Sequence, residues 1–285
     1  MLYYAVKGGE GMKNLQAAVD IWIEKTQSTL GLDMPKEHIH SAYELYFLLA
    51  GERRYFIDGE LYNVAPGNLV VVPGNAIHKT LALNSKGYER YVLYFTEESL
   101  SDVRRDLGED VFSHFSSLGC VQFPPEQAVQ MRERFERIFA EEAKNDVFSF
   151  SMKRSLLGEI VSMALRYGVK KECAADEGAD TIQKVARHIG GCFAEPWTLE
   201  DAARMACMER TYFSKRFKAL TGFNFSSYLT QLRLSAARQL LLNTDMNISE
   251  IAAHTGFSGS NYFGDVFLRV YGMSPKEYRK QNKNT

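Results

Sequence analysis

The last hundred residues of the chain carry one pattern twice, and this internal repeat constrains the fold more than any other feature. The first copy contains "FSKRFKALTGFNFSSYL" and the second contains "FGDVFLRVYGMSPKEYR". Four positions recur at a displacement of 50: Phe213, Phe217, Gly222 and Tyr228 correspond to Phe263, Phe267, Gly272 and Tyr278. A period of this length is typical of a duplicated structural unit, so we expect two copies of one small helical fold.

Each copy is predicted to fold as a helix, a tight turn and a second helix. The first helix of each copy begins with the spacing of a capping box, at Thr198 and Asp201 and again at Asn247 and Glu250. Gly256 suits the turn of the second copy, because glycine adopts a positive φ angle at least cost. The two phenylalanines of each second helix are four residues apart, so they share one face and are predicted to point into a core.

The opposite face of each second helix is short, polar and able to form hydrogen bonds, as a helix in the major groove of DNA requires. It carries Thr211, Ser214, Lys215 and Lys218 in the first copy, and Ser260, Asn261 and Gly264 in the second. One continuous helix is predicted between the copies from an apolar stripe at Leu229, Leu232, Ala236 and Leu240. Such a connector would hold the two units one turn of DNA apart, or ~34 Å. The alternative is a helical bundle that has similar spacings by chance.

Charge is unevenly distributed along the chain. From Asp180 to the end there are 14 Lys and Arg against 9 Asp and Glu, a balance of +5, whereas residues 1–179 carry 20 against 26, a balance of −6. A basic C-terminal third favours binding to a polyanion such as DNA. Chance segregation of solvated charges is the alternative explanation.

Residues 38–95 are predicted to form β-strands, because short runs rich in Val, Tyr and Phe are separated by Gly, Asn and Pro. Asp58-Gly59 is a hairpin signal, and many short strands at this spacing favour a sandwich or a small barrel. After residue 124 the apolar period becomes helical, which predicts helices over 129–139 and 148–167. The apolar periodicity is lost over residues 171–180, which are predicted to be a linker.

The sequence also disfavours several classes of protein. The chain has no CxxC pair, which fits a reducing cytoplasm and argues against a disulfide framework or a zinc knuckle; its cysteines are Cys120, Cys173, Cys192 and Cys207. The N-terminus lacks a basic start followed by an apolar run, so no signal peptide is expected. Prolines and glycines interrupt the longest apolar stretch, so no membrane span is expected.

The stretch "ISEIAAHTGFSGSNYFGDVFLRVYGMSPKEYRK" resembles the C-terminal signature of the AraC (arabinose regulator) family of bacterial transcription factors. The resemblance covers about residues 180–280 and implies a DNA-binding domain of two helix-turn-helix motifs joined by a long helix. It also implies which residues face DNA: Arg210, Thr211, Ser214 and Lys215 in the first unit, and Ser260, Asn261 and Asp265 in the second. Asp265 departs from the family pattern, in which a basic or neutral polar residue is more usual at this position. Phosphates repel an acid unless it accepts a hydrogen bond from a cytosine amino group.

Residues 38–78 resemble the cupin pattern, which begins here with "HIHSAYEL". The resemblance implies a small β-barrel with a possible ligand set at His38, His40, Glu44 and His78, and strand alternation places Tyr46 on the same face as Glu44. Three roles remain open for these residues: an effector pocket without a metal, a pocket with a bound metal, or a framework with no ligand. Imidazole and carboxylate groups suit Fe, Mn, Ni or Zn.

Two departures from the cupin pattern weaken the hypothesis of an enzyme. Gly31 lies one place early, and Ala82 stands where the pattern has asparagine. We therefore expect no resident cofactor. Tyr46, Arg54 and Tyr55 are candidates for contacts with a sugar-like effector and are equally compatible with ordinary strand surface.

Together these patterns predict an α+β protein, with an N-terminal cupin-like β-barrel, flanking helices, and a C-terminal all-α domain of two helix-turn-helix motifs. The expected division is a sensing domain over 1–120, a helical dimerisation segment over 121–170, a linker over 171–180 and a DNA-binding domain over 181–285. The expected function is that of a cytoplasmic transcription regulator, not an enzyme, with a carbohydrate as candidate effector. Expected partners are double-stranded DNA, the effector, RNA polymerase and a second copy in a homodimer. The alternative is a metal-dependent cupin enzyme or a metal sensor fused to a DNA-binding domain.

Overall fold

A computed structural model of the chain describes residues 21–31, 40–144, 146–174 and 178–282. The chain divides into two compact units, Met1–Ile57 with Tyr62–Ala174, and Asp58–Leu61 with Ala175–Thr285. The β-sheets belong to the N-terminal part of the chain, and all regular structure from Ala179 onward is helical. The predicted combination of a β-rich N-terminal domain and an all-α C-terminal domain is therefore confirmed.

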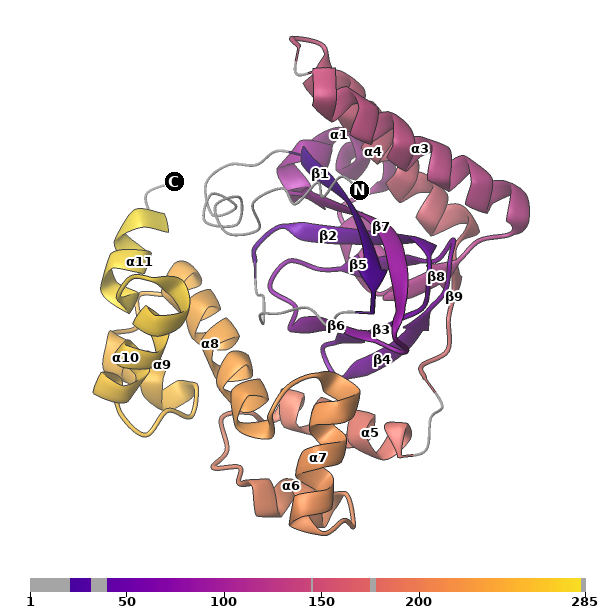
Figure 1. Cartoon of the computed structure of the whole chain (residues 1–285). Coiled ribbons are helices and arrows are strands. Elements are labelled where there is room, and N and C mark those ends of the chain that lie inside the picture. The colour runs from indigo at the N-terminus through magenta and orange to yellow at the C-terminus, as the bar shows by residue number, and fades with distance from the viewer. Residues whose placement is uncertain (1–20, 32–39, 145, 175–177, 283–285) are drawn as a thin grey trace. The chain divides into compact units, whose positions relative to one another are not determined.

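The N-terminal domain is built on two β-sheets (Figure 1). The larger sheet has the strand order β1-β7-β2-β5-β8-β9, formed by β1 (Ile21–Leu30), β2 (Tyr43–Ala50), β5 (Leu69–Val72), β7 (Lys86–Phe95), β8 (Cys120–Gln122) and β9 (Val169–Lys170). The smaller sheet has the order β4-β3-β6, formed by β3 (Arg53–Ile57), β4 (Glu60–Val64) and β6 (His78–Ala82). Helical segments follow β7: η1 (Glu97–Leu100), α1 (Ser101–Leu107), α2 (Val111–Ser116), α3 (Pro125–Lys144) and α4 (Ser149–Tyr167).

The hairpin predicted at Asp58-Gly59 is confirmed, since these two residues form the turn between β3 and β4. Asp58 has a φ angle of 43° and Gly59 one of 93°. Positive φ at both central residues is the pattern of a type I′ turn, whose twist matches that of the flanking strands.

The central strand β2 supplies both hydrophobic layers of the domain. Leu45 and Phe47 pack into the cluster shared with the flanking helices, whereas Tyr46 and Leu48 pack into a second cluster between the two sheets. Successive side chains of a strand point to opposite faces, so one strand can serve two cores. The predicted inward face of Glu44, Tyr46 and Leu48 is therefore observed.

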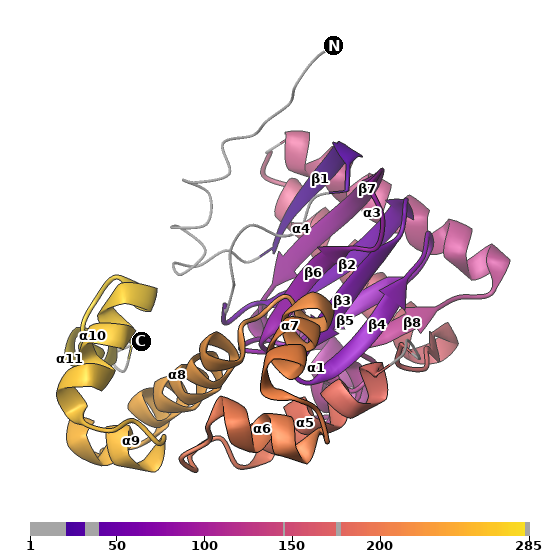
Figure 2. The same cartoon turned by 60° about the horizontal axis from the view of Figure 1, so that its bottom comes forward.

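Helices α3 and α4 cover the outer face of the larger sheet (Figures 1 and 2). Phe135 of α3 stacks on Phe47 of β2, with ring centroids 5.0 Å apart and planes inclined by 7°. Within the predicted helical stripe, Met131 and Ile138 are buried as well, but Val129 is 59% exposed and Phe139 is 38% exposed. The helix pair therefore buries one stripe against the sheet and leaves apolar side chains on its outer side.

The C-terminal domain contains the two predicted helix-turn-helix units. Its helices are α5 (Ala179–Gly191), α6 (Leu199–Met205), α7 (Arg210–Thr221), α8 (Phe225–Asn243), α9 (Ile248–His254), α10 (Ser260–Tyr271) and α11 (Pro275–Asn282). Figures 1 and 2 show that α8 joins a group formed by α5, α6 and α7 to a group formed by α9, α10 and α11. Both predicted capping boxes are present, one from Thr198 and Asp201 at α6 and one from Asn247 and Glu250 at α9.

The turn of each helix-turn-helix unit requires a residue with positive φ. Gly256 has a φ angle of 78°, as predicted, and a Cβ atom there would lie 2.5 Å from the carbonyl oxygen of Ala194. The corresponding residue of the first unit is Cys207, which has a φ angle of 52°. The first turn therefore adopts the same left-handed backbone without glycine, at some conformational cost.

Each unit has its own aromatic core, as the repeat predicts. Phe213 and Phe217 are fully buried in the first unit, and Phe263 and Phe267 are fully buried in the second. The apolar stripe predicted for α8 is only partly correct. Leu229 is buried as predicted. Further along the helix, the buried leucines are Leu234 and Leu241, whereas Leu232 and Leu240 of the predicted stripe are half-buried. The N-terminal turns of α8 contact the first aromatic core and its later turns contact the second, so a single straight stripe does not describe it.

The segment predicted as a linker, 171–180, has no regular secondary structure over residues 171–174. Helix α5 begins at Ala179, so the last two residues of the predicted linker are helical, and residues 175–177 lie outside the described ranges. The four cysteines are free thiols. In the part of the chain that the structure describes, no helix is both long and apolar enough to cross a lipid bilayer.

Phe217→Ala should lower the free energy of unfolding of the C-terminal domain by about 3–5 kcal/mol, because it removes a fully buried ring and leaves a cavity. Denaturant titration of the full-length protein, followed by far-UV circular dichroism, measures the change. Lys218→Ala is the matched control, since this neighbouring side chain is exposed. Equal stability of Phe217→Ala and Lys218→Ala would contradict the packing described for α7.

Candidate functional site

Helix α7 presents a polar face on the side opposite its buried phenylalanines. Arg210, Thr211, Lys215 and Lys218 are exposed on this helix, and Ser214 is half-buried. The helix begins with Glu209 as N-cap, whose carboxylate accepts a hydrogen bond from the backbone N–H of Tyr212 at 2.9 Å. Because Phe213 and Phe217 fix the rotation of the helix, the candidate DNA-contacting side chains are held outward.

Helix α10 repeats this geometry with a different set of side chains. Asn261 and Asp265 are exposed and Ser260 is half-buried, so all three candidate residues of the second unit are accessible. The displacement of 50 places Asp265 at the position that Lys215 occupies in the first unit. The two recognition helices, α7 and α10, therefore share a shape but carry opposite charge at one corresponding site.

Two exposed tyrosines were not among the DNA-contacting residues predicted from the sequence. Tyr212 is 54% exposed and Tyr262 is 55% exposed, and they are again 50 residues apart. Each lies in the first turn of a recognition helix, beside the polar residues described above. The repeat alignment shows an aromatic residue at this position in both copies, and the helix phase set by the two phenylalanines places it away from the core.

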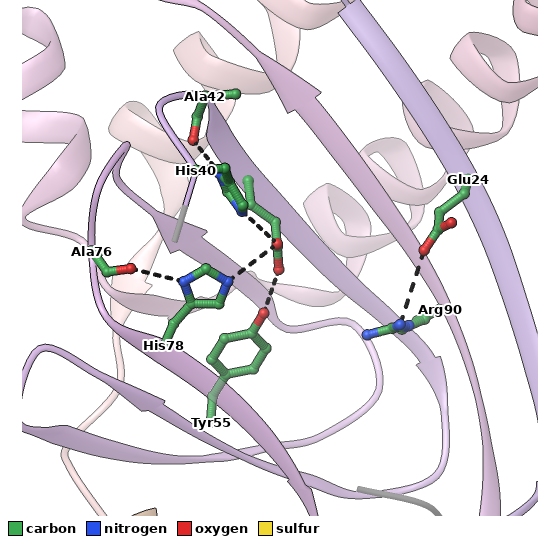
Figure 3. A network of polar contacts seen from close by, with 8 residues as sticks. Glu24, His40, Ala42, Tyr55, Ala76, His78 and Arg90 are labelled. Carbon is green, nitrogen blue, oxygen red and sulfur yellow. Dashed lines mark hydrogen bonds and ion pairs between the residues drawn. The ribbon is translucent and has the colours of Figure 1, made fainter. Parts of the chain in front are cut away.

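The N-terminal domain encloses a second polar cluster around Glu44. This carboxylate and the imidazole of His78 are buried, and His40 is partly exposed. The Nε2 atom of His40 lies 3.3 Å and that of His78 lies 3.5 Å from the same oxygen, Oε2 of Glu44. The hydroxyl of Tyr55 donates a hydrogen bond to the other oxygen of Glu44. Figure 3 shows His40, His78 and Tyr55 converging from three sides. His38 lies outside the described residues.

Backbone carbonyl groups orient both imidazole rings. The Nδ1 atom of His40 lies 2.8 Å from the carbonyl oxygen of Ala42, and that of His78 lies 2.9 Å from the carbonyl oxygen of Ala76. A carbonyl oxygen can only accept, so each Nδ1 carries a hydrogen. In the neutral ring Nε2 would then direct a lone pair at Glu44. Two Nε2 atoms that face one carboxylate oxygen therefore favour a proton or a cation between them.

The electrostatics of the cluster favour the ionised carboxylate. Burial alone raises the pKa of Glu44, but the charge of His78 and the hydrogen bonds from His40 and His78 outweigh burial and hold the pKa well below its usual range. Burial and the neighbouring Glu44 together raise the pKa of Tyr55 well above its ordinary value. Tyr55 is therefore a neutral hydrogen-bond donor at physiological pH.

Two arginines that point into the interior of the sensor domain were also not among the effector-binding residues predicted from the sequence. Arg53 lies two residues before Tyr55 on β3, and therefore on the same side of that strand, and Arg90 lies on β7. The guanidinium carbon of Arg90 lies 5.1 Å from the ring centroid of Tyr46, and Figure 3 shows Arg90 beside Glu24. Arg54, the arginine proposed from the sequence, points to the opposite side of β3 and donates a hydrogen bond to Asn63 at 3.1 Å.

A charged and aromatic cluster inside a two-sheet domain, together with two exposed recognition helices in a helical domain, defines a ligand-responsive DNA-binding regulator. Comparison with family models agrees: residues 29–159 match the AraC-like ligand binding domain, and residues 202–281 match a helix-turn-helix domain. The chain belongs to the AraC family of transcriptional regulators.

Similar proteins include named transcription activators. The chain is 27% identical over 253 residues to the HTH-type transcriptional activator RhaR of Cronobacter sakazakii, with 86% of this chain and 87% of the relative covered. It is 24% identical over 245 residues to the protein of the same name from Mannheimia succiniciproducens, with the same coverage of both chains. Among solved structures, the DNA-binding domain of AdpA in complex with a target DNA is 30% identical over 35% of this chain and 91% of that chain, with a TM-score of 0.35.

The family assignment settles the general function of the two domains. The protein is an effector-responsive transcriptional regulator with a helix-turn-helix domain that binds DNA and a domain that binds a small molecule. Its family is one of regulators rather than of enzymes.

Proposed function

We propose that this protein is a cytoplasmic transcription activator that binds double-stranded DNA as a homodimer, responds to a carbohydrate and acts on RNA polymerase. The observation that carries the proposal is the pair of recognition helices, which have the same outward phase and are joined by α8. The proposed domains are a sensor over 1–120, a dimerisation segment over 121–170, a linker over 171–180 and a DNA-binding domain over 181–285. The names of its relatives support activation rather than repression.

On the DNA side, we assign different contacts to charged and neutral side chains. The cations of α7, Arg210, Lys215 and Lys218, suit phosphates, and arginine also suits the edge of guanine. The short polar side chains Thr211, Ser214, Ser260 and Asn261 suit base edges in the major groove. Asp265 suits only a cytosine amino group, because every phosphate repels it.

The proposed dimer interface is the outer side of α3 and α4. Val129, Phe139, Phe148 and Met152 are exposed on these helices and the turn that joins them. Several large apolar side chains exposed on one pair of helices favour a surface that another protein covers. A second copy of the chain is the proposed partner, and sedimentation analysis of Phe148→Asp against wild type tests it.

A carbohydrate suits the interior of the sensor because polar and aromatic groups alternate there. Glu44, His40 and Tyr55 offer hydrogen-bonding partners for hydroxyl groups. Trp22 and Tyr94 stack with ring centroids 5.4 Å apart, and the ring of Tyr94 also lies 5.2 Å from that of His40. Ligand sites commonly combine apolar walls with a few placed polar groups in this way.

Lys215→Ala should weaken binding of the full-length protein to a DNA site selected from random duplexes. The dependence of log affinity on log salt should also become shallower by about one, because fewer counterions are released. Fluorescence anisotropy over a series of salt concentrations measures both effects. Asp265→Asn is the matched variant at the corresponding repeat position, and it should bind as tightly as wild type or more tightly. An unchanged affinity in Lys215→Ala would remove Lys215 from the contact surface.

A metal sensor, or a metal-dependent cupin enzyme, is the second candidate function, favoured by the three candidate ligands in the sensor. Single ligand atoms of His40, Glu44 and His78 all lie within 4.8 Å of one another. The residues fit a metal, because each imidazole is held by a carbonyl at Nδ1 and presents Nε2 to the cluster, which is how metal-bound histidines are oriented. Fe, Mn, Ni or Zn suits this donor set, and His38 would be a fourth ligand.

Metal analysis of protein purified without added metal tests this second function. A metal site predicts near-stoichiometric Fe, Mn, Ni or Zn in the wild type and its loss in His40→Ala, because one of three clustered ligands is removed. His114→Ala, which alters an exposed histidine on α2, is the control and should retain the metal. Metal-free wild-type protein that still responds to a sugar would leave the first function standing and exclude the second.

A further inference from the structure

The interior of the sensor domain has a basic end in addition to the cluster around Glu44. We propose that the effector carries an anionic group, and that Arg53 and Arg90 bind this group while the cluster around Glu44 binds hydroxyls. This inference rests on the proposed function of the sensor as a carbohydrate site. The class of ligand is therefore a sugar acid or a sugar phosphate rather than a neutral sugar.

Strand alternation brings the two arginines to the same interior. On β7 the side chains of Val92 and Tyr94 pack between the sheets, so Tyr88 and Arg90 lie on that inner side too. On β3, Tyr55 packs between the sheets, and Arg53 is on its side of the strand. The two arginines thus approach from different sheets, one from each side of the interior.

A tyrosine ring holds the two guanidinium groups together. The guanidinium carbon of Arg53 lies 4.5 Å from the ring centroid of Tyr88, and that of Arg90 lies 5.6 Å from the same centroid. Stacking on an aromatic ring fixes the plane of a guanidinium while leaving its N–H groups to form hydrogen bonds at the edge. Two fixed, planar donors suit a carboxylate or a phosphate, which bind arginine through paired hydrogen bonds.

Charge and burial at this end also favour an anion. Arg53 is only 2% exposed, and Nε of Arg90 is buried and has no hydrogen-bond partner among the described residues. The carboxylate of Glu44 is already engaged by His40, His78 and Tyr55. The carboxylate of Glu24 lies 4.0 Å from Arg90, and the Glu24 side chain is 37% exposed. An anionic ligand would give Arg90 a closer and less solvated counter-charge than Glu24 provides.

The basic end and the hydroxyl-binding end are connected through one side chain. The ring of Tyr46 contacts the guanidinium group of Arg90. The same ring lies 5.1 Å, between centroids, from that of Tyr55, whose hydroxyl donates a hydrogen bond to Glu44. Along the sheet, Glu44 pairs with Tyr94 and Leu48 pairs with Arg90, so the two ends are four residues apart on the same strands. A ligand with hydroxyl groups at one end and an acid at the other would contact both.

Isothermal titration calorimetry on the full-length protein tests the proposal with charge-matched probes. The probes are glucuronate, galacturonate, gluconate and glucose 6-phosphate, with glucose and galactose as neutral parents and succinate as an acid without a sugar. We expect at least one anionic sugar to bind about tenfold or more tightly than its neutral parent, as one charge-assisted hydrogen bond implies. The carboxylate and phosphate probes distinguish the two sources of the anion.

Variants locate the binding. Arg53→Gln and Arg90→Gln should each reduce affinity for the anionic probe by about tenfold or more and leave any affinity for the neutral parent unchanged. Arg54→Gln is the matched control, because Arg54 is also buried on β3 but points to the other side. Arg90→Lys, which keeps the charge, should retain part of the binding and guards against loss of folding in Arg90→Gln.

The outcomes separate this inference from the function on which it rests. Equal binding of neutral and acidic sugars, or anion binding that survives both Arg53→Gln and Arg90→Gln, overturns the anionic site and leaves the carbohydrate effector standing. Binding of succinate as tight as that of the sugar acids overturns the carbohydrate effector and leaves the arginine site standing. Failure of every probe overturns both.

Discussion

The alternation of side chains along β2 is the constraint on which the sensor domain depends. Tyr43, Leu45 and Phe47 face the helices, whereas Glu44, Tyr46 and Leu48 face the space between the sheets. A slip of one residue would exchange the two sets, placing a carboxylate against Phe135 and aliphatic side chains among the histidines. The register of β2 with β5 and β7 therefore fixes the helical layer and the polar interior at the same time.

In the helical domain, the buried phenylalanine pairs of α7 and α10 fix the orientation of the functional residues, as the alternation of β2 does in the sensor domain. Burial of Phe213 and Phe217, and of Phe263 and Phe267, determines the rotation of each recognition helix about its axis. What remains outward can vary without cost to the core, because exposed positions tolerate substitution. The duplicated unit has thus kept its packing while other outward residues, such as Lys215 and Asp265, diverged between the two copies.

Much of this architecture could be predicted from local patterns. The repeat, both capping boxes, the Asp58-Gly59 turn and the inward face of Glu44 are each set by residues close in sequence. The inward arginines were missed because their position depends on which strands pair and on the phase of β7, which one sequence does not reveal. The buried face of α8 differs from the predicted stripe because the two halves of the helix pack against different cores. The predicted stripe assumes that one face of the helix packs against a single core.

The opposed charges of Lys215 and Asp265 have a consequence for how the protein lies on DNA. If both recognition helices carried the same side chains, they would read two half-sites of the same sequence. With the DNA contacts proposed for Lys215 and Asp265, the two ends of the domain would prefer different bases and would differ in their attraction to the backbone. The domain would then be polar, and a promoter could fix the direction in which it points by the order of its two half-sites.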